Sequence, residues 1–433
     1  MKFAVCTLGC KVNTYESEYI ISKLKELDFE YVDFNEYADI YIINTCTVTN
    51  TSDQKSRKMI SQTRKKNENA IVAVMGCFTQ IRENNESILD IADIVIGNTN
   101  KSKMVDYILD FIKNKNKIYN VENIMESKFD NINLTKFNTR TRALVKIEDG
   151  CENYCTYCII PYVRGKVRSK DKDVVIKEVT ELANNGYKEI VLTGIHTGHY
   201  GADLKDTDFS DLLTELEKID GIKRIRISSI EITELNDKFL EVLKNSKKIV
   251  NHIHIPLQAG SDHILKLMNR KYDKKYFLDK INKIKEIRKN IAITTVVIVG
   301  FPNETEEDFE ETLEFVKELG LAGGHAFPYS IRKGTPASKM SGQLTKEEKH
   351  LRVKKLINRF NELEDDYSKI FINKSVIVIP EVFEDGCLIG HTDNYLKVKF
   401  EGNCSLIGEE IEVKLIEYNN KIFDANIIEQ LSD

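Results

Sequence analysis

The sequence predicts an α/β multidomain fold with three parts. Short apolar runs alternate with helical patterns from residue 2 to about residue 113, and the same alternation returns after Arg142. From residue 369 onward, short β-like runs are separated by glycines instead. We therefore predict an N-terminal parallel α/β domain, a central partial (β/α) barrel and a small C-terminal β-barrel.

The 433 residues exceed what one hydrophobic core fills, about 250 to 300 residues. We predict a first domain at 1–113 and a linker at 114–139, where Asn and Lys are frequent and periodicity is weak. The barrel is expected at 140–368, ending in a charged helix at 345–372, and the last domain at 369–433.

The predicted strands are short, and most are rich in branched apolar residues. In the first domain they lie at 3–7, 40–44, 71–75 and 93–96. In the barrel they lie at 143–147, 189–193, 223–227, 252–255, 291–297 and 321–327. In the last domain they lie at 376–380, 396–400, 410–416 and 422–428.

Composition indicates the compartment more clearly than the partner. The chain has no uninterrupted apolar run of membrane-spanning length and no signal-like N-terminus, so we expect a cytoplasmic protein without a membrane partner. The odd count of nine cysteines fits a reducing compartment. A net charge of −5 neither supports nor excludes a nucleic-acid partner.

Three cysteines follow the first predicted barrel strand, in the segment Gly-Cys-Glu-Asn-Tyr-Cys-Thr-Tyr-Cys at 150–158. Three thiolates leave one iron of an iron–sulfur cluster without a protein ligand, which favours chemistry over electron storage. A zinc knuckle is the alternative, but no Cys or His pair lies nearby in the sequence to complete four ligands. Cys151, Cys155 and Cys158 are therefore the candidate catalytic ligands.

Three other cysteines each follow a predicted strand of the first domain, namely Cys10, Cys46 and Cys77. The carboxyl ends of neighbouring parallel strands meet at one edge of a sheet, so these thiols could hold a second cluster. They could equally be three small buried apolar residues, which is a common role of free cysteine. We assign no role to the remaining cysteines, Cys6, Cys387 and Cys404.

Several segments together resemble the radical S-adenosylmethionine (radical SAM) methylthiotransferase family over essentially the whole chain. They are Thr-Leu-Gly-Cys-Lys-Val-Asn at 7–13, the segment around the three-cysteine loop at 146–161, Arg-Gly-Lys-Val-Arg-Ser at 164–169, His-Ile-His-Ile-Pro-Leu-Gln at 252–258 and His-Ala-Phe-Pro-Tyr-Ser at 325–330. The Gly-Cys-Lys-Val-Asn form at 9–13 resembles the bacterial branch that modifies threonylcarbamoyladenosine in tRNA. The isopentenyladenosine branch has Gln-Met at the corresponding positions.

The resemblance implies two [4Fe-4S] clusters and S-adenosylmethionine. One cluster would lie on Cys151, Cys155 and Cys158, and an auxiliary cluster on Cys10, Cys46 and Cys77. The implied reaction inserts sulfur at adenine C2 by radical chemistry and transfers a methyl group to it. The implied partners are tRNA, a one-electron donor such as flavodoxin or ferredoxin, and a source of sulfur, and the last domain would be an RNA-contacting TRAM module.

Further site residues follow from strand ends and local charge. The candidate cofactor contacts are Gly194, Ser229, Glu231 and Gln258, which follow predicted strands, and Tyr157, which fills the aromatic position of the loop that the resemblance implies. The candidate RNA contacts are Arg140, Arg142, Arg164, Lys166 and Arg168. Histidines near strand ends are expected to be structural: His196, His252, His254 and His325.

The chain departs from the family pattern at Val296, where Asp is usual, at Asn303, where Gly is usual, and at Ile232, where Pro is usual. Residues 369–433 contain six Lys and twelve Asp or Glu, a net of −6, which is unfavourable for binding phosphates.

Two alternatives stay open at this point. The substrate of the same chemistry could be isopentenyladenosine in tRNA or a ribosomal protein. Outside enzymology, the chain could be a two-cluster electron-transfer or iron–sulfur scaffold protein, although such a protein would not need a six-unit barrel with an open iron.

Overall fold

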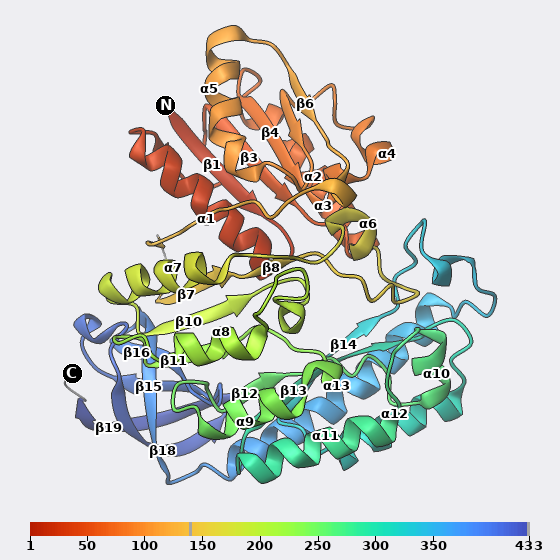
Figure 1. The fold of residues 1–433 in the computed structure, drawn as a ribbon, viewed down its shortest axis with the longest axis vertical. Helices are drawn as coiled ribbons and strands as arrows, with labels where there is room; N and C mark the ends of the chain where they lie inside the picture. The colour runs from red at the N-terminus through yellow and green to blue at the C-terminus, as the bar shows by residue number, and fades with distance from the viewer. Residues whose placement is uncertain (138–140, 431–433) are drawn as a thin grey trace.

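The computed structural model describes residues 1–137 and 141–430. Three parts follow one another along the chain, as the colours of Figure 1 show. The N-terminal unit lies at the top of that view, the central barrel lies below it, and the C-terminal barrel packs against one side of the central barrel. The predicted fold class is confirmed.

The N-terminal unit is a parallel sheet in the order β2-β1-β3-β4-β5-β6 within the described residues. Its strands are β1 Lys2–Thr7, β2 Glu30–Tyr31, β3 Ile40–Thr45, β4 Ile71–Gly76, β5 Ile94–Ile96 and β6 Ile118–Asn120. Its helices are α1 Lys11–Glu26, α2 Asn50–Lys66, α3 Cys77–Gln80, α4 Arg82–Asn85 and α5 Met104–Asn114. Every residue of β3 and β4 is buried, because helices cover both faces of the sheet.

The segment predicted as a linker, 114–139, is shared between two units. Strand β6 pairs with β5 and extends the N-terminal sheet. Further along, Ile132, Leu134 and Phe137 are buried in the core of the central barrel. The division at residues 113 and 140 stays a prediction, and we propose that this segment belongs to both neighbouring units.

The central barrel is built from two parallel sheets, β7-β10-β11 and β12-β13-β14. A parallel bridge between Ile225 and Ile249 joins them, so the strands form one open, curved wall. The strands are β7 Arg142–Lys146, β10 Glu189–Thr193, β11 Arg224–Ile227, β12 His252–His254, β13 Ala292–Val299 and β14 Gly323–Pro328, with a short antiparallel pair β8 Glu148–Asp149 and β9 Arg168–Ser169. The helices are α6 Ile160–Arg164, α7 Lys172–Asn184, α8 Phe209–Leu216, α9 Asp237–Asn245, α10 Asp262–Leu267, α11 Lys274–Ile287 and α12 Glu306–Glu318.

Helix α13, Lys346–Lys369, runs from the central barrel to the C-terminal barrel. It begins at a capping box in which the Thr345 hydroxyl accepts from the Glu348 amide, 3.2 Å away. The C-terminal unit is a closed barrel in the order β15-β16-β17-β19-β18. Its strands are β15 Ser375–Glu384, β16 Cys387–Thr392, β17 Lys397–Glu401, β18 Ile411–Asn419 and β19 Ile422–Gln430.

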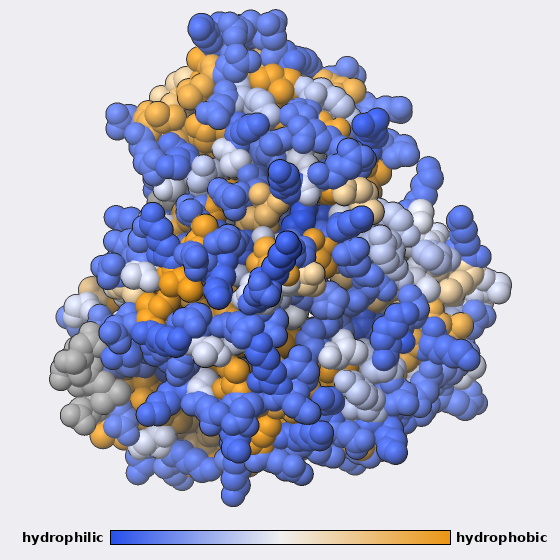
Figure 2. Space-filling view, viewed as in Figure 1, coloured by the Kyte–Doolittle hydropathy of each residue, from blue (hydrophilic) through white to orange (hydrophobic). Residues whose placement is uncertain are grey.

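The face of the molecule shown in Figure 2 is mostly hydrophilic, with apolar residues in small separate groups. Among the described residues, no helix has both the length and the apolar character needed to cross a membrane.

Candidate functional site: two cysteine triads

The three-cysteine loop begins at a position that only glycine fits. Gly150 has φ +94°, and a Cβ there would lie 1.9 Å from the backbone oxygen of Lys166. The Cys151 amide donates to the Gly165 oxygen at 3.0 Å, and the Thr156 amide donates to the Met268 oxygen at 3.1 Å. These contacts hold the loop against the segments that follow α6 and α10.

The loop brings its three thiols close enough to influence one another's ionisation. Burial above all, together with negative charge on Cys158 and Cys155, raises the pKa of Cys151 to about 12. Burial and the neighbouring Cys155 raise the pKa of Cys158 to about 12 as well. Cys151 and Cys158 are therefore thiols near neutral pH without a metal, and the positive iron ions of an iron–sulfur cluster would favour their thiolate form.

Sequence reasoning missed Arg270, which contacts this triad. Its Nη1 donates to the Cys155 Sγ at 3.1 Å, its Nε donates to the Tyr272 hydroxyl at 3.2 Å, and its Nη2 pairs with Glu231. Glu231, a predicted cofactor contact, is therefore held by an arginine that itself touches a cysteine of the loop triad. No local sequence signal distinguishes Arg270 from a surface residue. It lies between the polar residues Asn269 and Lys271, shortly after the short helix α10.

The second triad forms at the carboxyl ends of β1, β3 and β4. Cys10 precedes α1, Cys46 follows β3 and Cys77 begins α3. Gly9 has φ +100°, and a Cβ there would lie 2.9 Å from the Cβ of Cys46, so glycine lets these two segments meet. Burial raises the pKa of Cys46, and charges on Cys77 and Cys10 raise it further, so the three thiols are neighbours.

Two nitrogen donors contact the buried Cys77. The Arg164 Nε lies 3.3 Å from its Sγ, and the Asn98 Nδ2 lies 3.4 Å from it. Hydrogen bonds to sulfur and a nearby positive charge both stabilise a thiolate ligand. The donor set of this second site therefore also fits a cluster bound by three thiolates.

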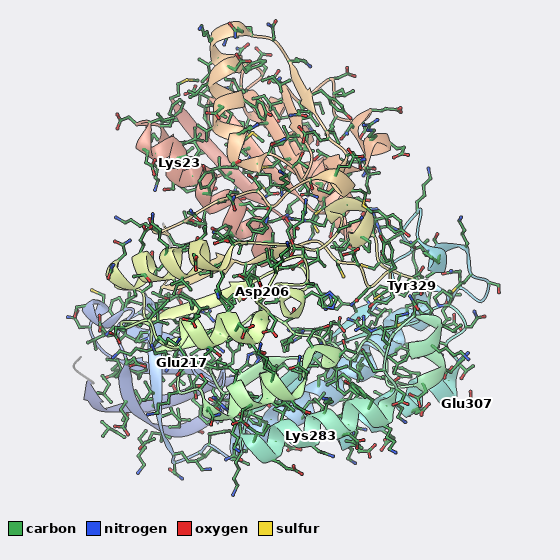
Figure 3. All side chains as sticks on the ribbon, viewed as in Figure 1. Lys23, Asp206, Glu217, Lys283, Glu307 and Tyr329 are labelled. Atoms are coloured by element: carbon green, nitrogen blue, oxygen red, sulfur yellow. The ribbon has the colours of Figure 1, made fainter. Side chains whose placement is uncertain are left out.

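One cavity of about 1500 Å³ joins the second triad to the ends of the barrel strands. Cys10, Cys46 and Cys77 line it from the N-terminal unit. Gly194 and Ser229 line it from the barrel. Tyr329, labelled in Figure 3, lines it near the end of β14, and Lys346 lines it from α13.

The other predicted cofactor contacts have structural partners. Tyr157 is half-buried, and its ring lies 6.5 Å from that of Phe301. Gln258 has φ 68°, and its backbone is hydrogen-bonded on both sides to Val296 and Ile298. Their contact with a cofactor remains a proposal.

The predicted RNA contacts divide into different environments. Arg164 is fully buried and Arg168 is 8% exposed, so neither side chain lies at the surface of this structure, and their contact with RNA stays a prediction. Both are drawn inward by carboxylates, as the ion pairs of Asp149 show. Arg142 is half-buried and pairs with Glu381 of the C-terminal barrel, Lys166 is exposed, and Arg140 lies outside the described residues.

Among the predicted structural histidines, His196 contacts the site directly. Its Nδ1 lies 3.7 Å from the Cys151 Sγ, and its Nε2 lies 3.1 Å from the carboxylate of Glu234. Its ring stacks on that of His199 with centroids 3.8 Å apart. The ring thus lies between the carboxylate of Glu234 and the thiol of Cys151.

Two family profiles match the chain. The profile of the radical SAM superfamily matches residues 145–316, and that of the uncharacterized protein family UPF0004 matches residues 2–97. The barrel and its three-thiol loop therefore define a radical SAM protein.

Curated relatives match the chain from end to end. The Bacillus subtilis protein "Threonylcarbamoyladenosine tRNA methylthiotransferase MtaB" is 44% identical over 99% of this chain and 96% of its own length. A protein of the same name from Aquifex aeolicus is 39% identical over 93% and 97%. A "tRNA-2-methylthio-N(6)-dimethylallyladenosine synthase" from Clostridium botulinum is 37% identical over 97% and 95%. The chain belongs to the radical SAM methylthiotransferase family.

A solved structure supports the fold alone. The radical S-adenosylmethionine methyltransferase TsrM from Kitasatospora setae matches with a TM-score of 0.58 at 12% identity, covering 78% of this chain and 76% of its own.

Proposed function

We propose that this protein converts N6-threonylcarbamoyladenosine in tRNA to its 2-methylthio derivative, replacing the hydrogen on adenine C2 by a methylthio group. The observation that carries the proposal is the shared cavity, because the second cysteine triad and the ends of the barrel strands open into it. The choice of substrate rests on the 44% identity to a relative named for threonylcarbamoyladenosine, against 37% to one named for dimethylallyladenosine.

The radical SAM fold implies a [4Fe-4S] cluster and S-adenosylmethionine, and the loop thiols Cys151, Cys155 and Cys158 would hold the cluster. A second [4Fe-4S] cluster on Cys10, Cys46 and Cys77 is part of the proposal. When bound, these groups supply the radical, the sulfur and the methyl group of the reaction. Adenine C2–H is unactivated, so an acid–base residue could not replace them.

The chain's own residues hold and orient these groups. Gly150 gives the loop its turn, and Arg270 places a positive charge against Cys155. Arg164 does the same at Cys77 from the opposite unit of the protein. Gly194 and Ser229 face the same cavity as the second triad. An adenine base bound in that cavity would therefore lie within reach of these barrel residues and of the second triad.

The remaining partners are proposals of the same kind. A one-electron donor such as flavodoxin or ferredoxin would reduce the loop cluster, and an external sulfur source would replenish the sulfur consumed. tRNA would approach over Lys166 and Lys346, which are exposed. The reaction would take place in the cytoplasm.

The test is mass spectrometry of tRNA nucleosides from bacteria that lack their own threonylcarbamoyladenosine methylthiotransferase, with and without this gene. Appearance of 2-methylthio-N6-threonylcarbamoyladenosine supports the proposal, and the Cys151→Ala variant should abolish it. Unchanged threonylcarbamoyladenosine alongside soluble, cluster-loaded protein would contradict it. Methylthiolation of isopentenyladenosine in the same digest would identify the alternative substrate.

A further inference from the structure

The cavity that contains the second cysteine triad has a basic side, formed by helix α13. Lys346, Lys349, His350 and Val353 line the cavity, and they share one face of the helix because they are three or four residues apart. No Asp or Glu is among the described residues that line this cavity. In a chain with a net charge of −5, such a lining is suited to an anionic ligand.

Lys349 differs from the other buried lysines. It is 8% exposed, and its ammonium group makes no hydrogen bond or ion pair with a described residue. The other three lysines buried within the described part of the chain each pair with a carboxylate, namely Lys101, Lys146 and Lys170. Burial lowers the pKa of Lys349, and no described carboxylate raises it again. Because a buried charge ordinarily has an oppositely charged partner, a bound anion would stabilise Lys349.

The packing around Lys349 fixes the place of its charge. Gly300, directly after β13, has φ +72°, and a Cβ there would lie 2.3 Å from the Lys349 Cγ, so glycine makes room for the lysine stem. The ammonium nitrogen lies 5.0 Å from the centroid of the Tyr329 ring. Glu304 is occupied elsewhere, since its carboxylate pairs with Arg352 at 2.5 Å and accepts from the Gly300 amide at 2.6 Å. These contacts hold the cation at the cavity wall.

An exposed aromatic ring lies close to this cation along the chain. Phe327 of β14 lines the same cavity and is 50% exposed. It is two residues before Tyr329, whose ring contacts Lys349 and which is labelled in Figure 3. Exposed aromatic rings stack on unpaired bases of single-stranded RNA. A base stacked on Phe327 would bring the phosphates of its own backbone into the neighbourhood of Lys349.

The size of the cavity also favours a nucleotide as the ligand. Its volume of about 1500 Å³ exceeds the range of about 300 to 1000 Å³ that is usual for small-molecule sites. It therefore has room for a nucleotide beside a cofactor. Lys346, on the same side of the cavity, is exposed, so the basic face of α13 extends from the surface to the buried Lys349.

We propose that Lys349 binds a backbone phosphate of the RNA substrate, next to the nucleotide that enters the cavity, with Lys346 as a second cation nearer the surface. This inference rests on the proposed function and adds a phosphate site to it. An ammonium group is a compact point charge, which suits a phosphodiester. Phosphate contacts fix the register of a bound nucleic acid, so this contact would place the target base against Phe327.

The test measures how synthetic anticodon stem-loop RNAs bind to reconstituted full-length protein, by fluorescence anisotropy at several salt concentrations. One RNA carries threonylcarbamoyladenosine, and a second carries plain adenosine at that position. In further RNAs, one linkage at a time beside this nucleotide is a neutral methylphosphonate. Lys349→Gln removes the charge, and Lys349→Arg keeps it. Lys354→Gln is the matched control, because Lys354 is an exposed cation of α13 that does not line the cavity.

We expect one of the methylphosphonates to weaken binding to the parent protein and to Lys354→Gln by about tenfold. Lys349→Gln should weaken binding of the all-phosphate RNAs by a similar factor. It should also lower the slope of log Kd against log salt concentration by about 0.7 to 0.9, the value for one phosphate contact. The same methylphosphonate should cost Lys349→Gln nothing further, because the contact is already lost. Lys349→Arg should keep part of the affinity.

The inference is overturned if no methylphosphonate weakens binding to the parent protein, a result that requires no variant to fold. It is equally overturned if every methylphosphonate costs Lys349→Gln as much as it costs the parent protein. If Lys349→Gln loses affinity only for the RNA with threonylcarbamoyladenosine, Lys349 binds the carboxylate of the N6 substituent and not a phosphate. Failure of the proposed function is a separate result, because it appears as absent methylthiolation, whereas the phosphate contact is measured without turnover.

Discussion

Arg164 donates a hydrogen bond from its Nε to the Sγ of Cys77, 3.3 Å away, although the two residues belong to different units of the protein. Arg164 ends α6, just after the three-cysteine loop, and Cys77 begins α3 in the N-terminal unit. The same guanidinium pairs with Asp149, two residues before Cys151, with a nitrogen–oxygen distance of 3.1 Å. One buried side chain thus connects the second cysteine triad to β8, the strand that leads into the three-cysteine loop.

The connection is part of a buried ion-pair cluster between the two units. Glu16 of α1 pairs with Lys101, with Lys146 at 2.9 Å and with Arg164 at 3.1 Å, and Asp149 pairs with Lys146 at 2.7 Å. All five side chains are at most 5% exposed. Charges this deeply buried tolerate the loss of a partner poorly, so the cluster fixes how the N-terminal unit sits on the barrel.

Glu16→Gln should lower the free energy of unfolding by about 3 kcal/mol at pH 7, because it leaves buried cations with too little negative charge. Urea unfolding of both proteins measures the difference. Glu26→Gln is the matched control, since Glu26 lies on the exposed end of the same helix and its pair with Lys23 is solvent-accessible. If Glu26→Gln lowered the free energy of unfolding by a similar amount, the buried ion-pair cluster would contribute no more to stability than an exposed ion pair.

The same cluster predicts a loss of stability in acid. Burial opposes the ionisation of Glu16, but the charges of Lys101, Lys146 and Arg164 outweigh it and hold its pKa well below the ordinary value. A carboxyl group whose pKa is lowered by folding stabilises the protein above its unfolded pKa, about 4, and loses that contribution as the pH falls below it. Iron-free protein should therefore unfold at a lower urea concentration at pH 3.5 than at pH 6. Its free energy of unfolding should be lower at pH 3.5 by about 1 kcal/mol or more. Glu16→Gln should show a smaller change, and an equal change would contradict the assignment.

Gly150→Ala should prevent the three-cysteine loop from forming. Its Cβ would lie 1.9 Å from a backbone oxygen, which cannot move as a flexible side chain can. Gly186 is the matched control, because it has a similar φ of +87° but nothing within 4 Å of an added Cβ. Gly186→Ala should cost about 1 to 2 kcal/mol from backbone strain and keep full iron content. Gly150→Ala should lose the iron of the loop cluster, and iron and urea assays separate the two effects.

The meeting of Cys10, Cys46 and Cys77 was predictable from the sequence because parallel strands deliver their carboxyl ends to one edge of a sheet. Strand β16 was missed because Gly390 and His391 interrupt its apolar alternation. Its inward residues still alternate with outward ones, as its burial pattern shows.

The position of Arg164 could not be predicted. A basic residue in a polar segment is usually solvated, and the sequence predicts Arg164 to contact RNA. Its partners are Glu16 in the N-terminal unit and Asp149 in the central barrel. Only the packing of these two units against each other makes the burial of Arg164 favourable. The same holds for Arg270, whose contact with Cys155 joins residues 115 positions apart.

The two triads should lose iron independently. Cys151→Ala should halve the iron content of reconstituted protein, because the N-terminal triad is built from separate strands, and Cys77→Ala should halve it as well. The double variant should hold almost none. Cys404→Ser is the matched control, since Cys404 is exposed in the C-terminal barrel, outside both triads. Iron and sulfide analysis with electron paramagnetic resonance measures each cluster. If Cys151→Ala retained all the iron, the loop would not hold a cluster, and if Cys77→Ala did, the protein would have a single cluster and its N-terminal cysteines would be ordinary buried residues.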